Sequence, residues 1–375
     1  MRLRNFTPLL KRIDWSLLVI TMLLVFFGLA IQYSLGLNAE ASDFSFFKKQ
    51  LIALFIGMVI FCSFIFFDFR ALRNYAYPLY GLGLLMLLAV LFFGETLRGT
   101  RGWFVLAGFS FQAVELVKLI LVIVLANYWR KNIKDGRVAV KSVARSGVLV
   151  LAPAVLVLLQ PDMGSVLLLF VLWFILFLII DKQLPHILGV LFLLLLSGFM
   201  AWLFILAPYQ KERVLTFLVP GRDPLGVGYQ ITQSIIAVGS GQFFGRGLGL
   251  GPQSQLHFLP DANTDFVFSV IAEEFGFIGI CTLFTLYVLL LIRMIRILKT
   301  AYDDFSLFLV LGVIVLFSSQ VFVNIGMNVG VLPVTGVPLP LVSYGGSFLI
   351  ITLMSLGLLE SVVIHGSQKR SSSVD

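Results

Sequence analysis

Long apolar runs recur along this chain of 375 residues, and short polar segments separate most of them. A run of about 20 apolar residues can cross the hydrocarbon core of a bilayer as one helix. The pattern predicts ten such spans, at residues 15–36, 50–68, 75–93, 113–129, 146–160, 164–181, 187–207, 266–292, 305–332 and 346–364. Because the runs are continuous and do not alternate, we expect an all-α polytopic membrane protein and not a β-barrel.

One polar segment is much longer than the others and covers residues 208–265. We expect it to form a large loop within a single integral membrane domain that comprises residues 1–375. The composition agrees, since only 12% of the residues are charged, whereas a soluble domain has roughly a quarter. Cys62 and Cys281 both lie in apolar runs and are too few for a disulfide framework or a metal site. We expect both to be small core residues.

The distribution of charge predicts the orientation of the chain. A formal net charge of +8 would suggest a nucleic-acid partner for a soluble protein. In a membrane protein the positive-inside rule explains it, and no nucleic-acid partner is expected. If the N-terminus is cytoplasmic, most Lys and Arg residues fall on the cytoplasmic side, including the basic loop 130–145. Both termini should then be cytoplasmic, with segments 94–112, 160–162, 208–265 and 333–345 on the outer side.

Two carboxylates, Asp261 and Asp265, close the long polar segment where the eighth span begins. We expect Asp265 in the first turn of that helix, which Asn263 or Thr264 would cap. Small residues share its helical face and would let a neighbouring helix approach closely. These residues are Ser269, Ala272 and Gly276. A carboxylate held there could act as general base for a substrate hydroxyl; the alternative is an Asp favoured only by the helix dipole.

Four further ionisable residues lie inside predicted spans, where charge is costly and usually faces the interior. Glu115 and Lys118 are three positions apart and can pair on one helical face. The pair could serve only to make insertion possible, or Lys118 could meet a phosphate group near the outer surface. Glu273 and Glu274 lie about two turns into the eighth span. Pairing with a buried Lys or Arg is as reasonable for them as a functional role.

Several polar groups are predicted on the outer side, where an anionic lipid headgroup could lie. Arg98 and Arg101 stand on a side that should be poor in positive charge, and Arg can bind phosphate through two hydrogen bonds. Trp103 is also typical of a membrane interface. Asp162 follows Pro161 in a short turn, where Asp is a normal turn residue and also an outward-facing carboxylate.

A glycine-rich tract, residues 239–251, contains Arg246 and matches neither the P-loop nor the G-x-G-x-x-G pattern. We interpret it as backbone that can fold tightly over a ligand. A second broken polar stretch contains Asn324, Ser343 and Tyr344. Such backbone at membrane depth must pack within protein or line a wet cavity. The sequence contains no H-E-x-x-H, G-x-S-x-G or C-x-x-C motif.

Six ordered motifs resemble those of the SEDS family of cell-wall proteins. They are Gln160-Pro161-Asp162-Met163-Gly164, Gly228-Tyr229-Gln230, Gly245-Arg246-Gly247-Leu248-Gly249, Leu259-Pro260-Asp261-Ala262-Asn263-Thr264-Asp265-Phe266, Asn324-Ile325-Gly326-Met327 and Pro338-Leu339-Pro340-Leu341-Val342-Ser343-Tyr344-Gly345-Gly346. The resemblance extends from the first span to the last and is greater to the rod-shape members than to the division members. The chain departs from the family pattern at Asp261, where Glu is common, and at Asn263, where His is common.

The resemblance implies a SEDS-type helical bundle that is a peptidoglycan glycosyltransferase. Such an enzyme would polymerise lipid II on the outer face of the bacterial cytoplasmic membrane, for cell elongation and rod shape. Asp265 matches the catalytic Asp of the family, and would be the general base of an inverting transfer that releases undecaprenyl pyrophosphate. The implied partners are a class B penicillin-binding transpeptidase and membrane proteins of the elongation machinery.

The remaining candidate residues are expected to bind substrate. The family motifs point to Glu115, Lys118, Arg101, Trp103 and Asp162. We add Arg246, Asp261, Ser343 and Tyr344, because they lie in polar segments on the outer side.

The departing pyrophosphate needs positive charge, and Arg101, Lys118, Arg246 and Arg213 are candidates to contact it. A divalent cation, Mg²⁺ or Mn²⁺, could share that task, and no other cofactor and no protein metal site are expected. The residues leave two alternatives open. One is a flippase or transporter of lipid-linked precursor, which needs polar groups through the whole membrane. The other is a non-catalytic scaffold for a transpeptidase.

Overall fold

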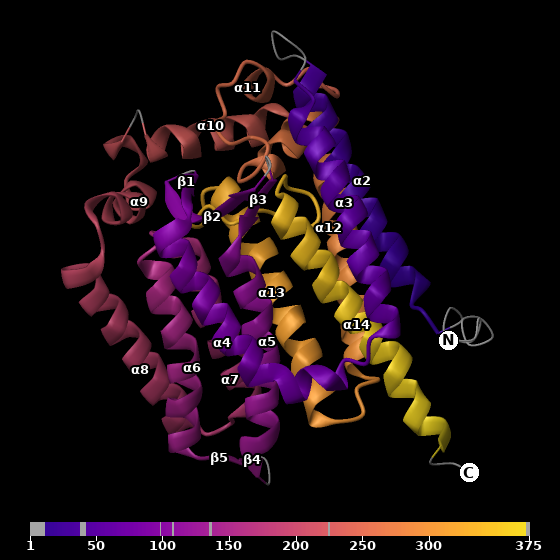
Figure 1. The fold of residues 1–375 in the computed structure, drawn as a ribbon. Coiled ribbons are helices and arrows are strands. Elements are labelled where there is room, and N and C mark those ends of the chain that lie inside the picture. Colours follow the sequence, from indigo (N-terminus) through magenta and orange to yellow (C-terminus); the bar gives the residue numbers. More distant parts are fainter. Residues whose placement is uncertain are drawn as a thin grey trace.

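The chain forms a bundle of long helices that run roughly side by side (Figure 1). The computed structural model describes residues 12–37, 43–97, 99–106, 109–134, 137–223 and 226–372. Arg98, one of the predicted phosphate-binding residues, lies outside these ranges. Within the described residues, nine helices are long and apolar enough to cross a membrane. The predicted all-α polytopic architecture is therefore confirmed.

The long helices lie near the predicted spans, with ends that differ by several residues. The first are α2 (Trp15–Leu37), α3 (Ser45–Phe66), α4 (Arg70–Phe93), α5 (Ala113–Asn132) and α6 (Val140–Leu158). The others are α7 (Met163–Ile180), α8 (Leu184–Met200), α12 (Val267–Leu298), α13 (Asp304–Asn328) and α14 (Gly346–Ser372). Helix α8 continues into a π-helical turn, η2 (Ala201–Ile205).

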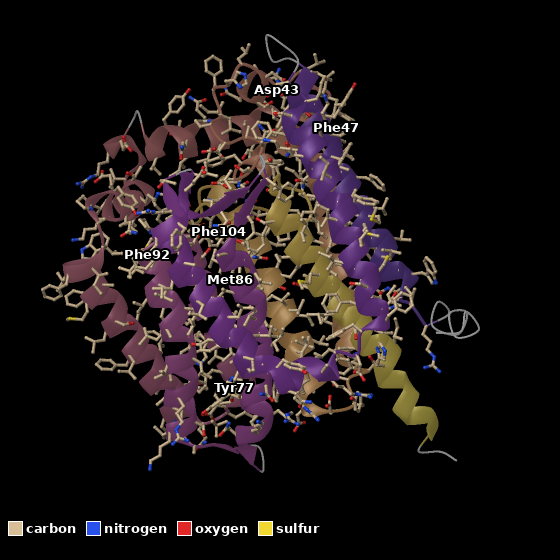
Figure 2. The ribbon with its side chains drawn as sticks, viewed as in Figure 1. Asp43, Phe47, Tyr77, Met86, Phe92 and Phe104 are labelled. Carbon is tan, nitrogen blue, oxygen red and sulfur yellow. The ribbon has the colours of Figure 1, made fainter. Side chains whose placement is uncertain are left out.

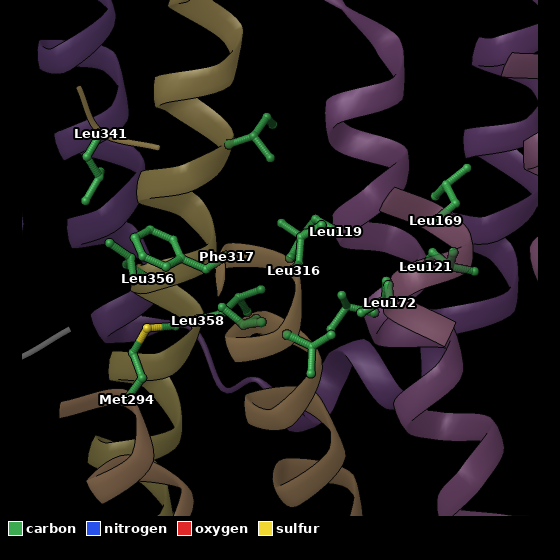
Figure 3. Packing of buried hydrophobic residues seen from close by; sticks show 14 of the residues in the cluster. Leu119, Leu121, Leu169, Leu172, Met294, Leu316, Phe317, Leu341, Leu356 and Leu358 are labelled. Carbon is green, nitrogen blue, oxygen red and sulfur yellow. The ribbon is translucent and has the colours of Figure 1, made fainter. Parts of the chain in front are cut away.

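Helix α5 is the centre of the bundle, because it is buried on almost every side. Every residue from Ala113 to Trp129 except Leu116 is buried. A helix that is apolar nearly all round is a core helix, and α4, α6, α7, α13 and α14 pack around this one. Figure 3 shows Leu119 of α5 close to Leu316 of α13 within the core. The charged pair of α5 is therefore enclosed by protein and does not face lipid.

The outer surface of the bundle is apolar, as a bilayer requires. Helix α8 buries only Val190, and Phe55 of α3 is 72% exposed. Cys62 and Cys281 are both exposed, so the expectation that they are core residues is wrong. An apolar run in a membrane protein has a lipid-facing side, and apolar sequence alone therefore does not imply burial.

One end of the bundle is covered by the segments that connect the helices, and we call it the α10 end. Between α4 and α5 lies an antiparallel sheet of β1 (Glu95–Leu97), β2 (Thr100–Leu106) and β3 (Phe109–Gln112). The segment predicted as a large loop contains α9 (Pro208–Leu218), η3 (Pro220–Arg222), α10 (Val227–Ser240) and α11 (Pro252–Gln255). Helix α10 runs across this end, and the hairpin of β4 (Ile133–Lys134) and β5 (Arg137–Val138) lies at the opposite end (Figure 1).

The glycine-rich tract packs against a break in α12. Gly276 has φ 61° and ψ −156°, which interrupts the helix. The amides of Arg246 and Gly247 donate to the carbonyls of Glu273 and Glu274 at 2.9 and 3.0 Å. The tract thus folds over α12, and a ligand held by its backbone stays a prediction. Glycine is required where the two backbones meet, because a Cβ at Gly276 would overlap the tract's backbone.

The start of α12 also differs from the prediction. The helix begins at Val267, its N-cap residue is Phe266, and no side chain caps it. The Thr264 hydroxyl donates instead to the carbonyl of Asp261 at 3.3 Å. Asp265 therefore lies in a turn before the helix, and neither Asn263 nor Thr264 is its cap.

We predict that Gly276→Ala lowers the free energy of unfolding by about 2 kcal/mol or more. The added Cβ would overlap the backbone of the tract, and alanine is strained at the positive φ of this position. The measurement is the thermal unfolding midpoint of the purified protein in detergent. Gly189→Ala is the matched control, since it lies in α8 with no atom within 4 Å of the added Cβ. Equal midpoints for the two variants would contradict the role assigned to the break.

Candidate active site

A cavity at the α10 end of the bundle contains Asp265, and we call it the Asp265 cavity. It encloses about 860 Å³, including the part that is open to solvent. Segments far apart in the sequence form its wall: the sheet, the starts of α7 and α14, helices α9 and α10, and the loop between α13 and α14. Its lining residues are Thr100, Trp103, Gln112, Pro161, Asp162, Met163, Arg213, Gln230, Asp261, Asp265, Val334, Thr335, Gly336, Pro338, Tyr344, Gly345 and Phe348.

Asp265 belongs to a tight turn that begins at Asp261. The Asp261 carbonyl accepts hydrogen bonds from the amides of Thr264, Asp265 and Phe266 at 3.0, 3.1 and 3.4 Å. Asp261 itself has φ 51°, a left-handed conformation that is uncommon for a residue other than glycine. The turn uses the amides but leaves the carbonyls of residues 263–265 pointing to other elements.

Side chains and one amide from other parts of the chain satisfy those three carbonyls in succession. Gln32 of α2 donates to the carbonyl of Asn263 at 2.9 Å, and so does the amide of Tyr344. The Ser343 hydroxyl donates to the carbonyl of Thr264 at 2.5 Å. Because each carbonyl has its own partner, the path of the backbone into Asp265 is fixed before any ligand binds.

Two asparagines of α13 hold the carbonyl of Asp265 itself. Asn324 and Asn328 are one turn apart, and the side-chain amide of each donates to this carbonyl at 2.9 Å. Asn324 also donates to the carbonyl of Val337 at 2.8 Å, next to the wall residues Gly336 and Pro338. Asn324 therefore connects the Asp265 turn to the wall segment that contains Val337.

Asp162 and Trp103 complete the side of the cavity near the sheet. The carboxylate of Asp162 caps α7 by accepting from the amide of Ser165 at 2.9 Å. Its other oxygen accepts from the side-chain amide of Gln112 at 3.2 Å. The Trp103 indole donates to the Thr100 hydroxyl at 3.3 Å. Asp162 is thus both the cap of α7 and a carboxylate on the cavity wall.

The Glu115–Lys118 pair lies outside the Asp265 cavity. The Lys118 ammonium and a Glu115 carboxylate oxygen are 2.7 Å apart, and both side chains are buried. Glu115 lines a different cavity of about 350 Å³ together with residues of α13 and α14, including Gln320, Thr352 and Ser355. The pair is therefore buried within the bundle and apart from Asp265, and a contact between Lys118 and a phosphate stays a prediction.

Two predicted arginines lie on the surface and bind backbone carbonyls. Arg101 donates to the carbonyls of Gly94 and Phe92 at 3.3 Å each. Its guanidinium therefore binds backbone carbonyls at the C-terminal end of α4. Arg246 donates to the carbonyl of Ser240 at 3.0 Å. Among the described residues that line the Asp265 cavity, Arg213 of α9 is the only Lys or Arg.

Glu273 and Glu274 are buried but pair with neutral donors. Glu273 accepts from the amides of Gln253 and Ser254 at 2.8 and 3.0 Å, at the start of α11. Glu274 accepts from the Ser34 hydroxyl at 2.6 Å and from the Gly249 amide at 3.1 Å. Glu273 therefore joins the start of α11 to α12, and Glu274 joins α2 and the glycine-rich tract to α12. Neither contact involves the Lys or Arg partner that we considered.

No group of three or more His, Cys, Asp or Glu side chains in the described part of the chain is arranged to hold a metal ion. The three aspartates of the Asp265 cavity thus do not form a ready-made metal site. A divalent cation that accompanies the substrate stays a prediction.

Comparisons with known proteins identify the family. A model of the cell cycle proteins FtsW, RodA and SpoVE matches residues 14–368. The chain belongs to this family. The resemblance drawn from its motifs is thereby confirmed.

Several relatives are similar over nearly their whole length. Peptidoglycan glycosyltransferase MrdB of Escherichia coli K12 is 37% identical, and the match covers 92% of this chain and 93% of that protein. The probable peptidoglycan glycosyltransferase FtsW of Trichlorobacter lovleyi is 36% identical, with 94% and 93% covered.

Two solved structures have the same fold. One is a chain from a peptidoglycan synthase complex that coordinates polymerization and crosslinking. It has a TM-score of 0.80 and is 36% identical, and the match covers 95% of this chain and 99% of that chain. The rod shape determining protein RodA of Thermus thermophilus has a TM-score of 0.69 and is 32% identical, with 94% and 96% covered.

Sequence reasoning overlooked the buried glutamines that hold the site. Gln32 fixes the Asp265 turn, and Gln50 of α3 binds the Ser343 carbonyl and the Gly345 amide at 3.1 and 3.2 Å. Gln32 is an amide side chain within an apolar run, whereas Gln50 directly follows Lys48 and Lys49 at the edge of one. A polar residue is costly in a membrane span, so the position of Gln32 was a signal that could have identified it.

We predict that Lys118→Met or Glu115→Gln alone destabilises the fold by about 3 kcal/mol or more, because each leaves its partner buried without compensation. The double variant should be more stable than either single variant. A double-mutant cycle of thermal unfolding midpoints in detergent measures this coupling. Strictly additive single effects would show that the two side chains do not depend on each other.

Proposed function

We propose that the chain is a peptidoglycan glycosyltransferase that polymerises lipid II into glycan strands for cell elongation and rod shape. The observation that carries this proposal is the Asp265 carboxylate, held on a fixed turn in a cavity that also contains Arg213. The family membership and the names of the relatives agree with it. A base and a cation that share one cavity are what transfer from a pyrophosphate-linked sugar requires.

Asp265 would accept the proton of the acceptor sugar's hydroxyl as that oxygen attacks the anomeric carbon of the donor. The bond from that carbon to the pyrophosphate oxygen breaks, and undecaprenyl pyrophosphate leaves with the bonding electrons. Arg213 is the side chain in the cavity that can stabilise this charge. One displacement inverts the anomeric carbon, so no covalent carboxylate nucleophile is needed.

Among the other residues, we assign Trp103, Asp162 and Tyr344 to substrate contact, because they line the Asp265 cavity. Asp261 also lines it and would orient a sugar. Ser343 would act through the backbone of Thr264, which its hydroxyl binds.

We propose that the chain lies in the bacterial cytoplasmic membrane and that the α10 end of the bundle is on the outer side, away from the cytoplasm. The basic loop at 130–145 surrounds β4 and β5 at the opposite end, which the positive-inside rule places in the cytoplasm. Residues Asp14 and Glu360, close to the two ends of the described chain, are in contact with each other through a hydrogen bond. Because these two residues are in contact, the two ends of the described chain lie on the same side of the bundle. This agrees with the proposal that both termini are cytoplasmic.

A class B transpeptidase is the proposed partner, because one similar structure belongs to a complex of polymerization and crosslinking. A flippase is less favoured than an enzyme, because the residues that line the Asp265 cavity all come from the α10 end and do not continue through the membrane. Membrane proteins of the elongation machinery are further proposed partners.

We predict that Asp265→Asn reduces lipid II polymerisation by at least about a hundredfold, because the variant cannot accept the proton. The measurement is the formation of labelled glycan by the full chain in detergent or vesicles, with and without a class B transpeptidase. The thermal midpoint of the variant should stay close to that of the wild type. Absence of polymer from the wild type in both settings, or full activity of the variant, would overturn the proposal.

We predict that Asn324→Ala lowers kcat by about ten- to a hundredfold with little change in KM, because it removes the side chain that joins the Asp265 turn to the Val337 segment of the cavity wall. Asn127→Ala is the matched control, since Asn127 is an equally buried asparagine of α5 outside the Asp265 cavity. Steady-state rates at several lipid II concentrations separate the two constants. An effect confined to KM would show that Asn324 acts on binding and not on the base.

A further inference from the structure

A second cavity borders the turn that contains Asp265, and we call it the His257 cavity. It encloses about 520 Å³. Its lining residues are Phe46, His257, Leu259, Pro260, Asp261, Ala262, Asn263 and Thr264. Asp261 lines both cavities. The two cavities therefore adjoin at Asp261.

The groups in the His257 cavity suit a sugar better than a phosphate or a lipid tail. Asp261 supplies a carboxylate, Asn263 an amide and His257 an imidazole, all of which can bind sugar hydroxyl or acetamido groups. Phe46 supplies a ring, 37% exposed, on which the apolar face of a pyranose can pack. None of the described residues that line it is Lys or Arg, whereas phosphate sites favour such cations.

Two aromatic side chains that are in contact connect the linings of the two cavities. The rings of Phe46 and Tyr344 meet edge to face with their centroids 4.8 Å apart. Phe46 lines the His257 cavity, and Tyr344 lines the Asp265 cavity. Phe46 lies in the first turn of α3, at the same end of that helix as Asp43 and Phe47 in Figure 2. A ligand that extends from one cavity to the other would therefore follow this pair of rings.

The His257 cavity is built on a constrained backbone. His257 and Asp261 both have left-handed conformations, with φ 57° and 51°. Such residues cost of order 1 kcal/mol or more each and are common at functional sites. The amide of Leu259 donates to the carbonyl of Gln253 at 3.0 Å, which holds the segment between them.

We propose that the His257 cavity binds a phosphate-free sugar of the growing glycan while the chain's reacting end lies beside Asp265. This inference rests on the proposed function. A glycan attached to a pyrophosphate lipid carries phosphate only at its reducing end, so a site for its more distant sugars does not require a cation. Holding the chain at a distant sugar keeps it bound between transfers, and the cavity therefore sets the length of the product.

The test uses Phe46→Ala and His257→Ala in the full-length protein. With labelled lipid II, both variants should give products about threefold shorter on average, while the rate of the first coupling of two lipid II molecules stays within about twofold. Both should also bind a soluble peptidoglycan tetrasaccharide, free of lipid and phosphate, at least about tenfold more weakly than the wild type. Phe244→Ala is the matched control, because Phe244 is a 77% exposed aromatic residue that lines neither cavity.

Unchanged product length and unchanged tetrasaccharide binding in a wild type that polymerises would overturn this inference and leave the proposed function intact. An equal loss of first coupling and of product length would also overturn it, because the cavity would then act on the reaction itself. If the wild type makes no polymer, the proposed function fails, and tetrasaccharide binding still decides whether the cavity is a sugar site.

Discussion

The candidate site depends on three consecutive backbone carbonyls, those of Asn263, Thr264 and Asp265. They belong to a turn and not to a helix, so no regular ladder pairs them. In a membrane protein an unpaired buried carbonyl costs several kcal/mol. Side chains of α2, α13 and the loop before α14 supply the missing donors. The same constraint that satisfies the backbone therefore fixes the position of the Asp265 carboxylate.

A connected set of hydrogen bonds extends this constraint to the cover of the bundle. Asn328 accepts from the Ser269 hydroxyl of α12 at 2.7 Å, and Ser269 is 2.7 Å from the Ser234 hydroxyl of α10. Ser234 also donates to the carbonyl of Asn328 at 2.7 Å. One asparagine therefore joins α10, α12 and the turn. Because α10 lies across the end of the bundle, its placement and the geometry of the base are set together.

The sequence could predict the bundle but not the contacts that shape the site. Apolar runs indicate helices near their true positions because a bilayer imposes one length on every span. The apolar runs do not indicate which side of a helix faces the protein and which faces lipid. Cys62 was therefore expected in the core, whereas it lies on the surface. The motif around Asp265 predicted a carboxylate of interest, whereas a turn at Asp261 and a break at Gly276 depend on backbone packing between distant segments. Arg101 and Arg246 were expected to contact phosphate, which stays a prediction. Each donates hydrogen bonds to nearby backbone carbonyls, contacts that their positions in the sequence did not reveal.

The charge balance of the Asp265 cavity bears on how a pyrophosphate can enter it. Three aspartates and Arg213 are the charged residues among those that line it, so the described wall carries a net negative charge when all four are ionised. A pyrophosphate adds further negative charge at the point where the leaving group must be stabilised, and one guanidinium offsets only part of it. The aspartates would repel a bare pyrophosphate, and they would attract one that arrives with a divalent cation. The negative wall therefore favours a cation carried in with the substrate over one held permanently by the protein.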